Sequence, residues 1–242
     1  MAKKHRILNG LVFQEEGAFQ AASVYLCDDR IVSEEAYLAA EGTETLTDAG
    51  GAYVIPGLTD IHFHGCMGSD CCDGTEEAFR TIAQYELQQG VTSITPATMT
   101  MSEETLTDIC HAAKGFSCPQ GADFCGLYME GPFISPGKKG AQNEKYIRLA
   151  DTEMLHRLQQ ACGGIIRTVA VAPEMEGAMD FIRANGDDIQ ISLAHTTADY
   201  DTAKEALSCG ASQLTHMYNA MMPSATVPPA PSARLPTAAT AW

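Results

Sequence analysis

The feature that most constrains the fold of this chain is a regular alternation of strand-like and helix-like segments from residue 52 onward. Short apolar segments alternate there with segments whose apolar residues recur at helical spacing. We expect strands at residues 52–64, 91–97, 123–129, 165–172, 189–194 and 212–215. We expect helices between them at residues 75–89, 102–113, 152–161, 177–184 and 200–208. This alternation predicts parallel strands joined by right-handed crossover helices.

The predicted elements make up more than half of a barrel. Six strands alternating with five helices indicate an α/β chain with an incomplete (β/α)8 TIM barrel of about six βα units. An open, doubly wound sheet would show the same alternation. We rank that alternative second, because no glycine-rich dinucleotide fingerprint opens the first helix.

Two further segments flank the barrel. Residues 1–54 hold short alternating segments broken by glycines and acidic residues, which predicts a small antiparallel β element, the N-terminal part of a small β-sandwich domain. Residues 55–223 form the partial barrel. Residues 224–242 are rich in Pro, Ala and Thr, a composition that predicts a disordered or extended tail.

Potential metal ligands stand at the ends of the predicted strands. They are His62, His64, Glu130, His195 and His216. Barrel enzymes build their sites at the C-terminal ends of the strands, so we expect these side chains to meet. His62 and His64 are two residues apart and would face the same side of an extended strand. Imidazoles with one carboxylate suit Zn, Fe, Mn or Co.

The composition excludes several classes of partner. A net charge of −16 repels phosphate backbones and anionic membrane surfaces, so we expect neither nucleic acid nor a membrane. The nine cysteines include no CxxC pair, and the N-terminal apolar segment is too short for a secretory signal. We therefore expect reduced thiols in a cytoplasmic protein.

Several runs of the sequence carry a family resemblance. They are Pro56-Gly57-Leu58-Thr59-Asp60-Ile61-His62-Phe63-His64-Gly65, Met129-Glu130-Gly131-Pro132-Phe133, Leu193-Ala194-His195-Thr196 and Leu214-Thr215-His216-Met217-Tyr218-Asn219-Ala220-Met221. The first resembles the entry strand of the amidohydrolase superfamily. Together they resemble the N-acetylglucosamine-6-phosphate deacetylase family over roughly residues 5–223. The resemblance implies metal-dependent hydrolysis of the sugar acetamide to glucosamine 6-phosphate and acetate, in amino-sugar catabolism.

The resemblance also implies roles for the metal ligands. Glu130, His195 and His216 match the core ligands of the family, whereas His62 and His64 match a pair that binds a second metal in some members. We expect one or two divalent ions per site, zinc first, with iron, manganese or cobalt as alternatives.

Four residues match substrate contacts of the family. The backbone of Ala141 matches a contact to the sugar amide, and Asn219 and Ala220 match the turn that receives the phosphate. Gln142 stands where several relatives carry histidine. The implied partner is a small sugar phosphate, and relatives of this family are commonly homodimers.

The sequence departs from the family pattern at its C-terminal end. The family's acid/base aspartate follows the eighth strand, so we expect it beyond the end of this chain and assign no catalytic residue within it. One hypothesis is that residues 224–242 are a frameshift product. Two alternatives to the deacetylase stay open: an inactive truncated fragment of that enzyme, and a cyclic-amide hydrolase of the same superfamily.

Overall fold

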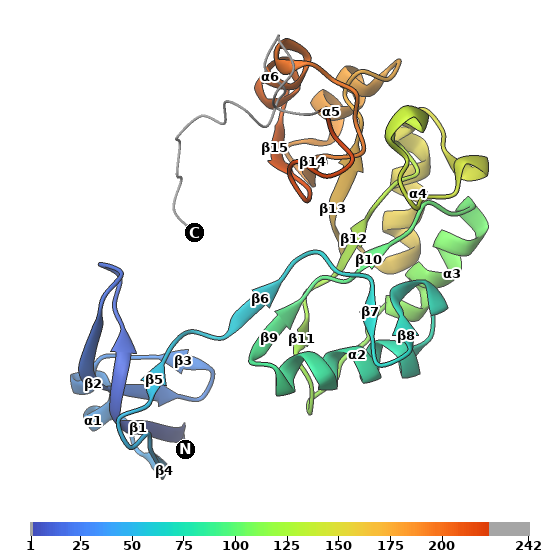
Figure 1. The fold of residues 1–242 in the computed structure, drawn as a ribbon. Helices are drawn as coiled ribbons and strands as arrows, with labels where there is room; N and C mark the ends of the chain where they lie inside the picture. Colours follow the sequence, from blue (N-terminus) through green and yellow to red (C-terminus); the bar gives the residue numbers. More distant parts are fainter. Residues whose placement is uncertain (1, 223–242) are drawn as a thin grey trace. The chain divides into compact units, whose positions relative to one another are not determined.

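The computed structural model describes residues 2–222, which divide into two compact units (Figure 1). The first unit is Met1–Gly57, and the second begins at Leu58. The tail expected at residues 224–242 lies outside the described residues.

The N-terminal unit is built on one five-stranded sheet. Its elements are β1 (Ala2–Phe13), β2 (Phe19–Cys27), β3 (Arg30–Ile31), α1 (Glu34–Ala39), β4 (Gly42–Asp48) and β5 (Tyr53–Val54). The strand order is β3-β2-β1-β4, and β5 also pairs with β1. β2 is antiparallel to β1, whereas β4 and β5 are parallel to it. The expectation of a purely antiparallel element is therefore wrong, because α1 carries the chain back before β4 begins.

The second unit contains the predicted parallel strands. They are β6 (Leu58–Asp60), β9 (Val91–Ile94), β10 (Ala97–Thr98), β11 (Asp123–Phe124), β12 (Leu127–Met129), β13 (Ile166–Val171), β14 (Gln190–Leu193) and β15 (Ala211–Leu214). β9 and β10 are two halves of one barrel strand, and so are β11 and β12. Neighbouring strands pair in parallel and in chain order, from β6 through to β15.

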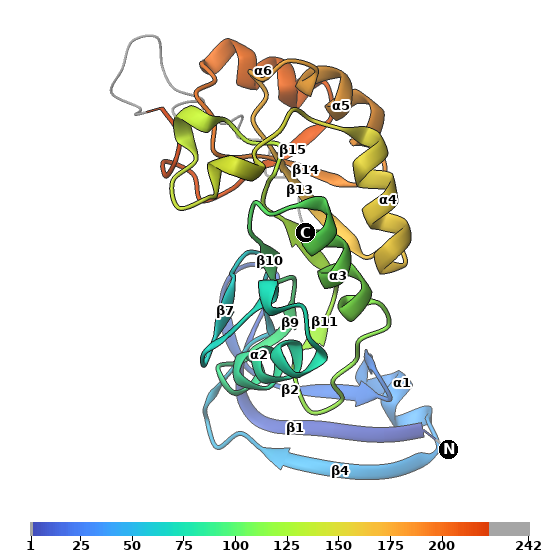
Figure 2. The same cartoon turned by 90° about the vertical axis from the view of Figure 1, so that its right-hand side faces the viewer.

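Helices connect these strands, as the periodicity predicted. They are α2 (Glu76–Gln88), α3 (Glu103–Ala113), α4 (Thr152–Cys162), α5 (Ala178–Asn185) and α6 (Tyr200–Ser208). Figure 2 shows α3, α4, α5 and α6 following one another along the outer side of the strands. A doubly wound sheet requires a reversal of strand order, which the described strands lack. The prediction of a partial α/β barrel is confirmed.

The first predicted strand is not continuous. Tyr53–Val54 pairs with β1 in the N-terminal sheet, and Leu58–Asp60 pairs with β9 in the barrel. Pro56 lies between the two and has no backbone N–H to donate to a sheet. β6 ends at Asp60, so His62 follows the strand instead of ending it, and the backbone N–H of His62 donates to the Asp60 side chain over 3.0 Å. A short hairpin comes next, from β7 (Gly65–Cys66) and β8 (Ser69–Asp70).

Packing of the helices on the strands forms the core of the barrel unit. Leu106 of α3 and Leu158 of α4 join Leu127 and Ile166 of the strands in one buried cluster. Burying one such side chain contributes roughly 1.5–3 kcal/mol. This packing fixes the strand ends from which the polar residues project. Among the described residues, no helix is both long enough and apolar enough to cross a bilayer.

Candidate metal centre

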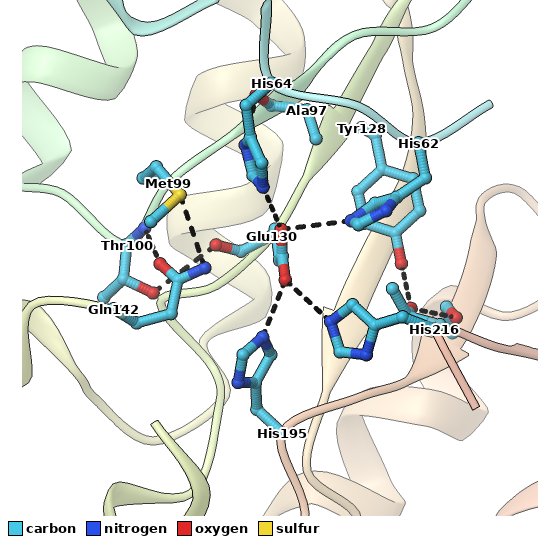
Figure 3. A network of polar contacts seen from close by, with 12 residues as sticks. His62, His64, Ala97, Met99, Thr100, Tyr128, Glu130, Gln142, His195 and His216 are labelled. Atoms are coloured by element: carbon cyan, nitrogen blue, oxygen red, sulfur yellow. Dashed lines mark hydrogen bonds and ion pairs between the residues drawn. The ribbon is translucent and has the colours of Figure 1, made fainter. Parts of the chain in front are cut away.

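The structure places Glu130 at the centre of a cluster of imidazoles. Glu130 follows β12 directly, and only 2% of its surface is exposed. Figure 3 shows the side chains of His62, His64, His195 and His216 converging on its carboxylate. The carboxylate is therefore held at the C-terminal end of the barrel by residues far apart in the sequence.

Each of the four imidazoles approaches one carboxylate oxygen through Nε2. The Nε2 atoms of His62 and His64 lie 3.0 and 2.9 Å from Oε2 of Glu130. Those of His195 and His216 lie 2.6 and 3.1 Å from Oε1. One ligand atom each from His62, Glu130 and His216 lie within 4.8 Å of one another. The structure thus brings together all five residues that the sequence singled out as potential metal ligands.

Hydrogen bonds at Nδ1 indicate the tautomer of two of these rings. Nδ1 of His195 lies 2.8 Å from the carbonyl oxygen of Lys138, and Nδ1 of His64 lies 3.2 Å from that of Ala97. A carbonyl oxygen only accepts hydrogen bonds, so Nδ1 carries the proton in each ring. In a neutral ring the Nε2 lone pair then faces the lone pairs of the Glu130 carboxylate. Such a contact requires a proton or a metal cation between the two atoms.

This arrangement fits a metal ion. A histidine that ligates a metal commonly donates its other ring N–H to a backbone carbonyl or a carboxylate, which fixes the tautomer and the ring orientation. His64 and His195 both have such a partner. Neutral imidazoles and one carboxylate form a donor set that suits zinc and neighbouring transition metals.

The electrostatics of the cluster keep Glu130 ionised. Burial by itself raises the pKa of the Glu130 carboxyl, but hydrogen bonds from the four histidines hold that pKa well below its usual range. The hydrogen bond to Glu130 raises the pKa of His64 and of His216, against the opposing effect of burial. The centre therefore keeps an ionised carboxylate in a buried position.

Tyr128, which was not among the residues expected at the site, packs against the cluster. Its ring lies edge to face with the ring of His62, at 4.7 Å between centroids. Its hydroxyl shares a short hydrogen bond with Thr215, and Thr215 contacts the hydroxyl of Ser192 at 2.7 Å. Strand periodicity could have identified Tyr128, because residues two apart on a strand face the same side and Glu130 is two positions away.

Gln142 and Ala141, both expected at the substrate, lie in the loop that follows β12. Gln142 is buried, and its Oε1 atom accepts a 2.6 Å hydrogen bond from the backbone N–H of Thr100. Its Nε2 atom lies 3.6 Å from the sulfur of Met99. Ala141 is exposed and helps to line a pocket of about 380 Å³ together with Met99, Thr100 and Tyr146. The amide of Gln142 thus joins two loops of the barrel mouth.

The other two expected substrate residues lie in the turn after His216. The exposed Asn219 donates its backbone N–H to the carbonyl of His216 over 2.9 Å. The carbonyl of Ala220 accepts a 3.0 Å hydrogen bond from the backbone N–H of Thr196, the residue after His195. This turn consequently connects the loops that carry two of the four histidines.

Comparisons with known proteins agree with this geometry. A 35% identical relative from Bacillus subtilis (strain 168), an N-acetylglucosamine-6-phosphate deacetylase, matches over 176 residues, which are 70% of this chain and 44% of the relative. The solved N-acetylglucosamine-6-phosphate deacetylase from Pasteurella multocida superposes with a TM-score of 0.81 at 25% identity, covering 94% of this chain and 60% of that chain. A variant of the enzyme from Mycobacterium smegmatis, solved in complex with N-acetyl-D-glucosamine-6-phosphate, has the same fold, with a TM-score of 0.77 at 23% identity over 96% of this chain and 59% of that chain.

The family assignment rests on a match over most of the chain. Residues 53–228 match the Amidohydrolase family, and they include every residue of the histidine and glutamate cluster. The cluster of His62, Glu130 and His216 is typical of amidohydrolase metal sites. The chain spans about half the length of the curated relatives it matches. It belongs to the amidohydrolase family.

Proposed function

We propose that this chain carries the divalent-metal centre of an amide hydrolase that acts on N-acetylglucosamine 6-phosphate and yields glucosamine 6-phosphate and acetate. The observation that carries the proposal is the contact of His195 Nε2 with Glu130 Oε1 at 2.6 Å, in a ring whose Nδ1 already donates to the Lys138 carbonyl. In a neutral His195 ring these two atoms would both offer lone pairs in a buried site. A divalent cation resolves that repulsion.

The proposed ligands are the five residues of the cluster: Glu130, His195, His216, His62 and His64. When bound, a divalent cation lowers the pKa of a coordinated water towards about 7 and polarises an amide carbonyl. The carbonyls of Ala97 and Lys138 orient the imidazoles of His64 and His195. Zinc is the proposed metal, because histidine nitrogen and carboxylate oxygen are its common ligands.

The substrate is proposed from the relatives and from the loops beside the cluster. Ala141, Gln142, Asn219 and Ala220 lie in loops at the barrel mouth and would contact the sugar phosphate. The relative from Bacillus subtilis and the solved protein from Pasteurella multocida are both N-acetylglucosamine-6-phosphate deacetylases. A phosphorylated sugar is an anion, and a metal ion in the pocket makes the local field favourable for it despite the net charge of −16.

The test combines metal content with acetate release. The full 242-residue chain is stripped with a chelator and reloaded with Zn²⁺, and the metal per chain is counted by mass spectrometry. Acetate release is then measured with N-acetylglucosamine 6-phosphate, with unphosphorylated N-acetylglucosamine and with hydantoin as a cyclic amide. We expect stoichiometric metal. Deacetylation by this chain would release acetate from the phosphorylated sugar only, would be lost on chelation and restored by Zn²⁺, and would overturn the expectation that the acid/base aspartate lies outside these residues.

Other results separate the alternatives. Absence of bound metal contradicts the metal centre itself. Opening of hydantoin without acetate release supports the cyclic-amide hydrolase. Bound metal with no hydrolysis contradicts catalysis by these residues alone and supports the fragment alternative.

A further inference from the structure

A second carboxylate lies behind the metal-centre loop that follows β14. Glu174 belongs to the loop after β13, and its side chain reaches the two residues that follow His195. Oε1 of Glu174 accepts hydrogen bonds from the backbone N–H of Thr197 at 2.6 Å and from its hydroxyl at 2.9 Å. Oε2 accepts a short hydrogen bond from the hydroxyl of Thr196. Both oxygens of Glu174 are therefore engaged by the segment next to His195.

The backbone at His195 needs such support. Its φ is 45°, in the left-handed region that residues with a Cβ rarely adopt. That conformation costs about 1–2 kcal/mol for a residue other than glycine. Strain of this kind persists only where the surrounding structure holds the backbone in place.

The loop of His195 is contacted by the loops after three other strands, β12, β13 and β15. The carbonyl of His195 accepts from the backbone N–H of Ser135 at 3.0 Å, and the N–H of Thr196 donates to Ala220 at 3.0 Å. Glu174 supplies the contact from the loop after β13, and it alone among these partners carries a charge. Hydrogen bonds to an ionised acceptor are roughly twice as strong as those between neutral groups.

Burial makes the contact of Thr196 hard to replace by water. Thr196 is only 1% exposed, and its hydroxyl both donates to Glu174 and accepts a 2.9 Å hydrogen bond from the backbone N–H of Ala198. Removal of the carboxylate leaves the hydroxyl proton without this acceptor. A buried polar group that loses its partner destabilises the conformation that buries it.

We propose that Glu174 is a positioning residue for His195, holding the loop that aims the His195 imidazole at the metal centre. The proposal rests on the proposed function, because it takes His195 as a metal ligand. Outer partners that orient a ligand change metal affinity by roughly 10–100-fold when they are removed. Glu174 acts through the backbone of Thr196 and Thr197, not through contact with the metal.

Two readouts on the full chain test this role without relying on activity. The first is Zn²⁺ affinity, measured by competition with a chromophoric chelator. The second is the visible absorption spectrum of the Co²⁺-loaded protein, which reports the geometry of the ligands. Glu174→Ala is expected to weaken Zn²⁺ binding about 10–100-fold and to change the Co²⁺ spectrum. Glu174→Gln keeps one carbonyl oxygen to accept from the Thr197 amide, so it should recover part of the affinity.

Matched variants make the result interpretable. Glu176→Ala removes the same charge from an exposed position of the same loop and should leave both readouts unchanged. Thr196→Val removes one contact of Glu174 from the other side while keeping the side-chain shape, and should weaken binding in the same direction. It serves as the test variant if Glu174→Ala does not fold, as judged by circular dichroism.

Three results would overturn the proposal. Zn²⁺ affinity within twofold of wild type in folded Glu174→Ala excludes the positioning role. A lower unfolding temperature with an unchanged Co²⁺ spectrum and affinity assigns Glu174 to stability only. Equal weakening by Glu176→Ala points to the net charge of the loop. Failure of the wild-type chain to bind Zn²⁺ or Co²⁺ is a different outcome, because it contradicts the proposed metal centre itself.

Discussion

The backbone N–H of Thr100 donates a 2.6 Å hydrogen bond to the side-chain Oε1 of Gln142, and both residues are buried. This bond joins the loop after β10 to the loop after β12. Thr100 also contacts the carbonyl of Glu130 through its hydroxyl, at 3.4 Å. The backbone beside the central carboxylate is therefore coupled to Gln142 through one residue.

Replacing Gln142 with leucine should destabilise the fold. The change keeps the approximate size of the side chain and leaves the Thr100 N–H buried without an acceptor, at a cost of about 1–3 kcal/mol. Urea unfolding followed by circular dichroism measures the difference. Gln160→Leu, at an exposed position of α4, is the control and should change stability by less than about 0.5 kcal/mol. Equal effects of the two substitutions would contradict the role of the Thr100 contact.

Replacing Gly131 with alanine should lower the free energy of unfolding by more than the strain of a left-handed backbone conformation alone would. Gly131 has φ of 87°, and a Cβ built there would lie 1.9 Å from Oγ1 of Thr100. Gly164 has nearly the same φ, 85°, with nothing within 4 Å of its built Cβ. Gly164→Ala should therefore cost about 1–2 kcal/mol for the left-handed backbone. Gly131→Ala should cost about 1–3 kcal/mol more, because of overpacking.

The difference between the two glycine variants isolates the close approach of Gly131 to Thr100. Their free energies of unfolding are compared under identical conditions, each against wild type. Equal losses would mean that the loop after β10 moves away without cost.

Replacing Glu130 with glutamine should remove tight metal binding. The substitution preserves shape and eliminates the one carboxylate that all four imidazoles contact. Removing a residue that only hydrogen-bonds to a metal ligand lowers metal affinity about 10–100-fold. Removing the Glu130 carboxylate, a proposed ligand itself, should lower metal affinity by more than that. Metal per chain after dialysis, measured by mass spectrometry, checks the expectation. Glu86→Gln, in helix α2 and also buried, should keep full metal content; unchanged metal content in Glu130→Gln would refute the ligand assignment.

The ion pair between Glu103 and Arg157 should make stability depend on pH. Nε of Arg157 donates to Glu103 Oε1 over 2.6 Å, and this hydrogen bond lowers the pKa of the Glu103 carboxyl. A carboxyl whose pKa is lower in the folded state stabilises the fold above its unfolded-state pKa, about 4.3 for glutamate. That stabilisation is lost as the pH falls through the lowered folded-state pKa.

The Glu103→Gln variant tests this coupling. Its unfolding temperature should lie below that of wild type at pH 6, and the gap should close as the pH falls below about 4. Glu104→Gln changes the same charge at the neighbouring exposed position in the first turn of α3. It controls for the interaction with the helix dipole, and a gap of the same size and pH dependence in both variants would exclude the Arg157 contact as the cause.

The sequence by itself determined the elements of the barrel and the residue types at its mouth. Thr75 and Ser102 cap α2 and α3 at the start of two predicted helices, since capping depends on local hydrogen bonds to N–H groups three residues away. Helical and strand periodicity identified the alternation, because each element must bury one face. Parallel strands end at the same edge of a barrel, so the placement of Glu130 near His195 and His216 could also be predicted.

Tertiary structure decided the contacts that define the geometry of the centre. The first predicted strand is divided between two units at Pro56, and β4 runs parallel to β1, because pairing depends on where connecting segments return the chain. The Nδ1 partner of His195 is the carbonyl of Lys138, 57 positions earlier, and the loop of His195 is held by Glu174 from another strand end. No periodicity encodes such contacts, because they depend on the conformations of several loops that meet only after the strands have paired.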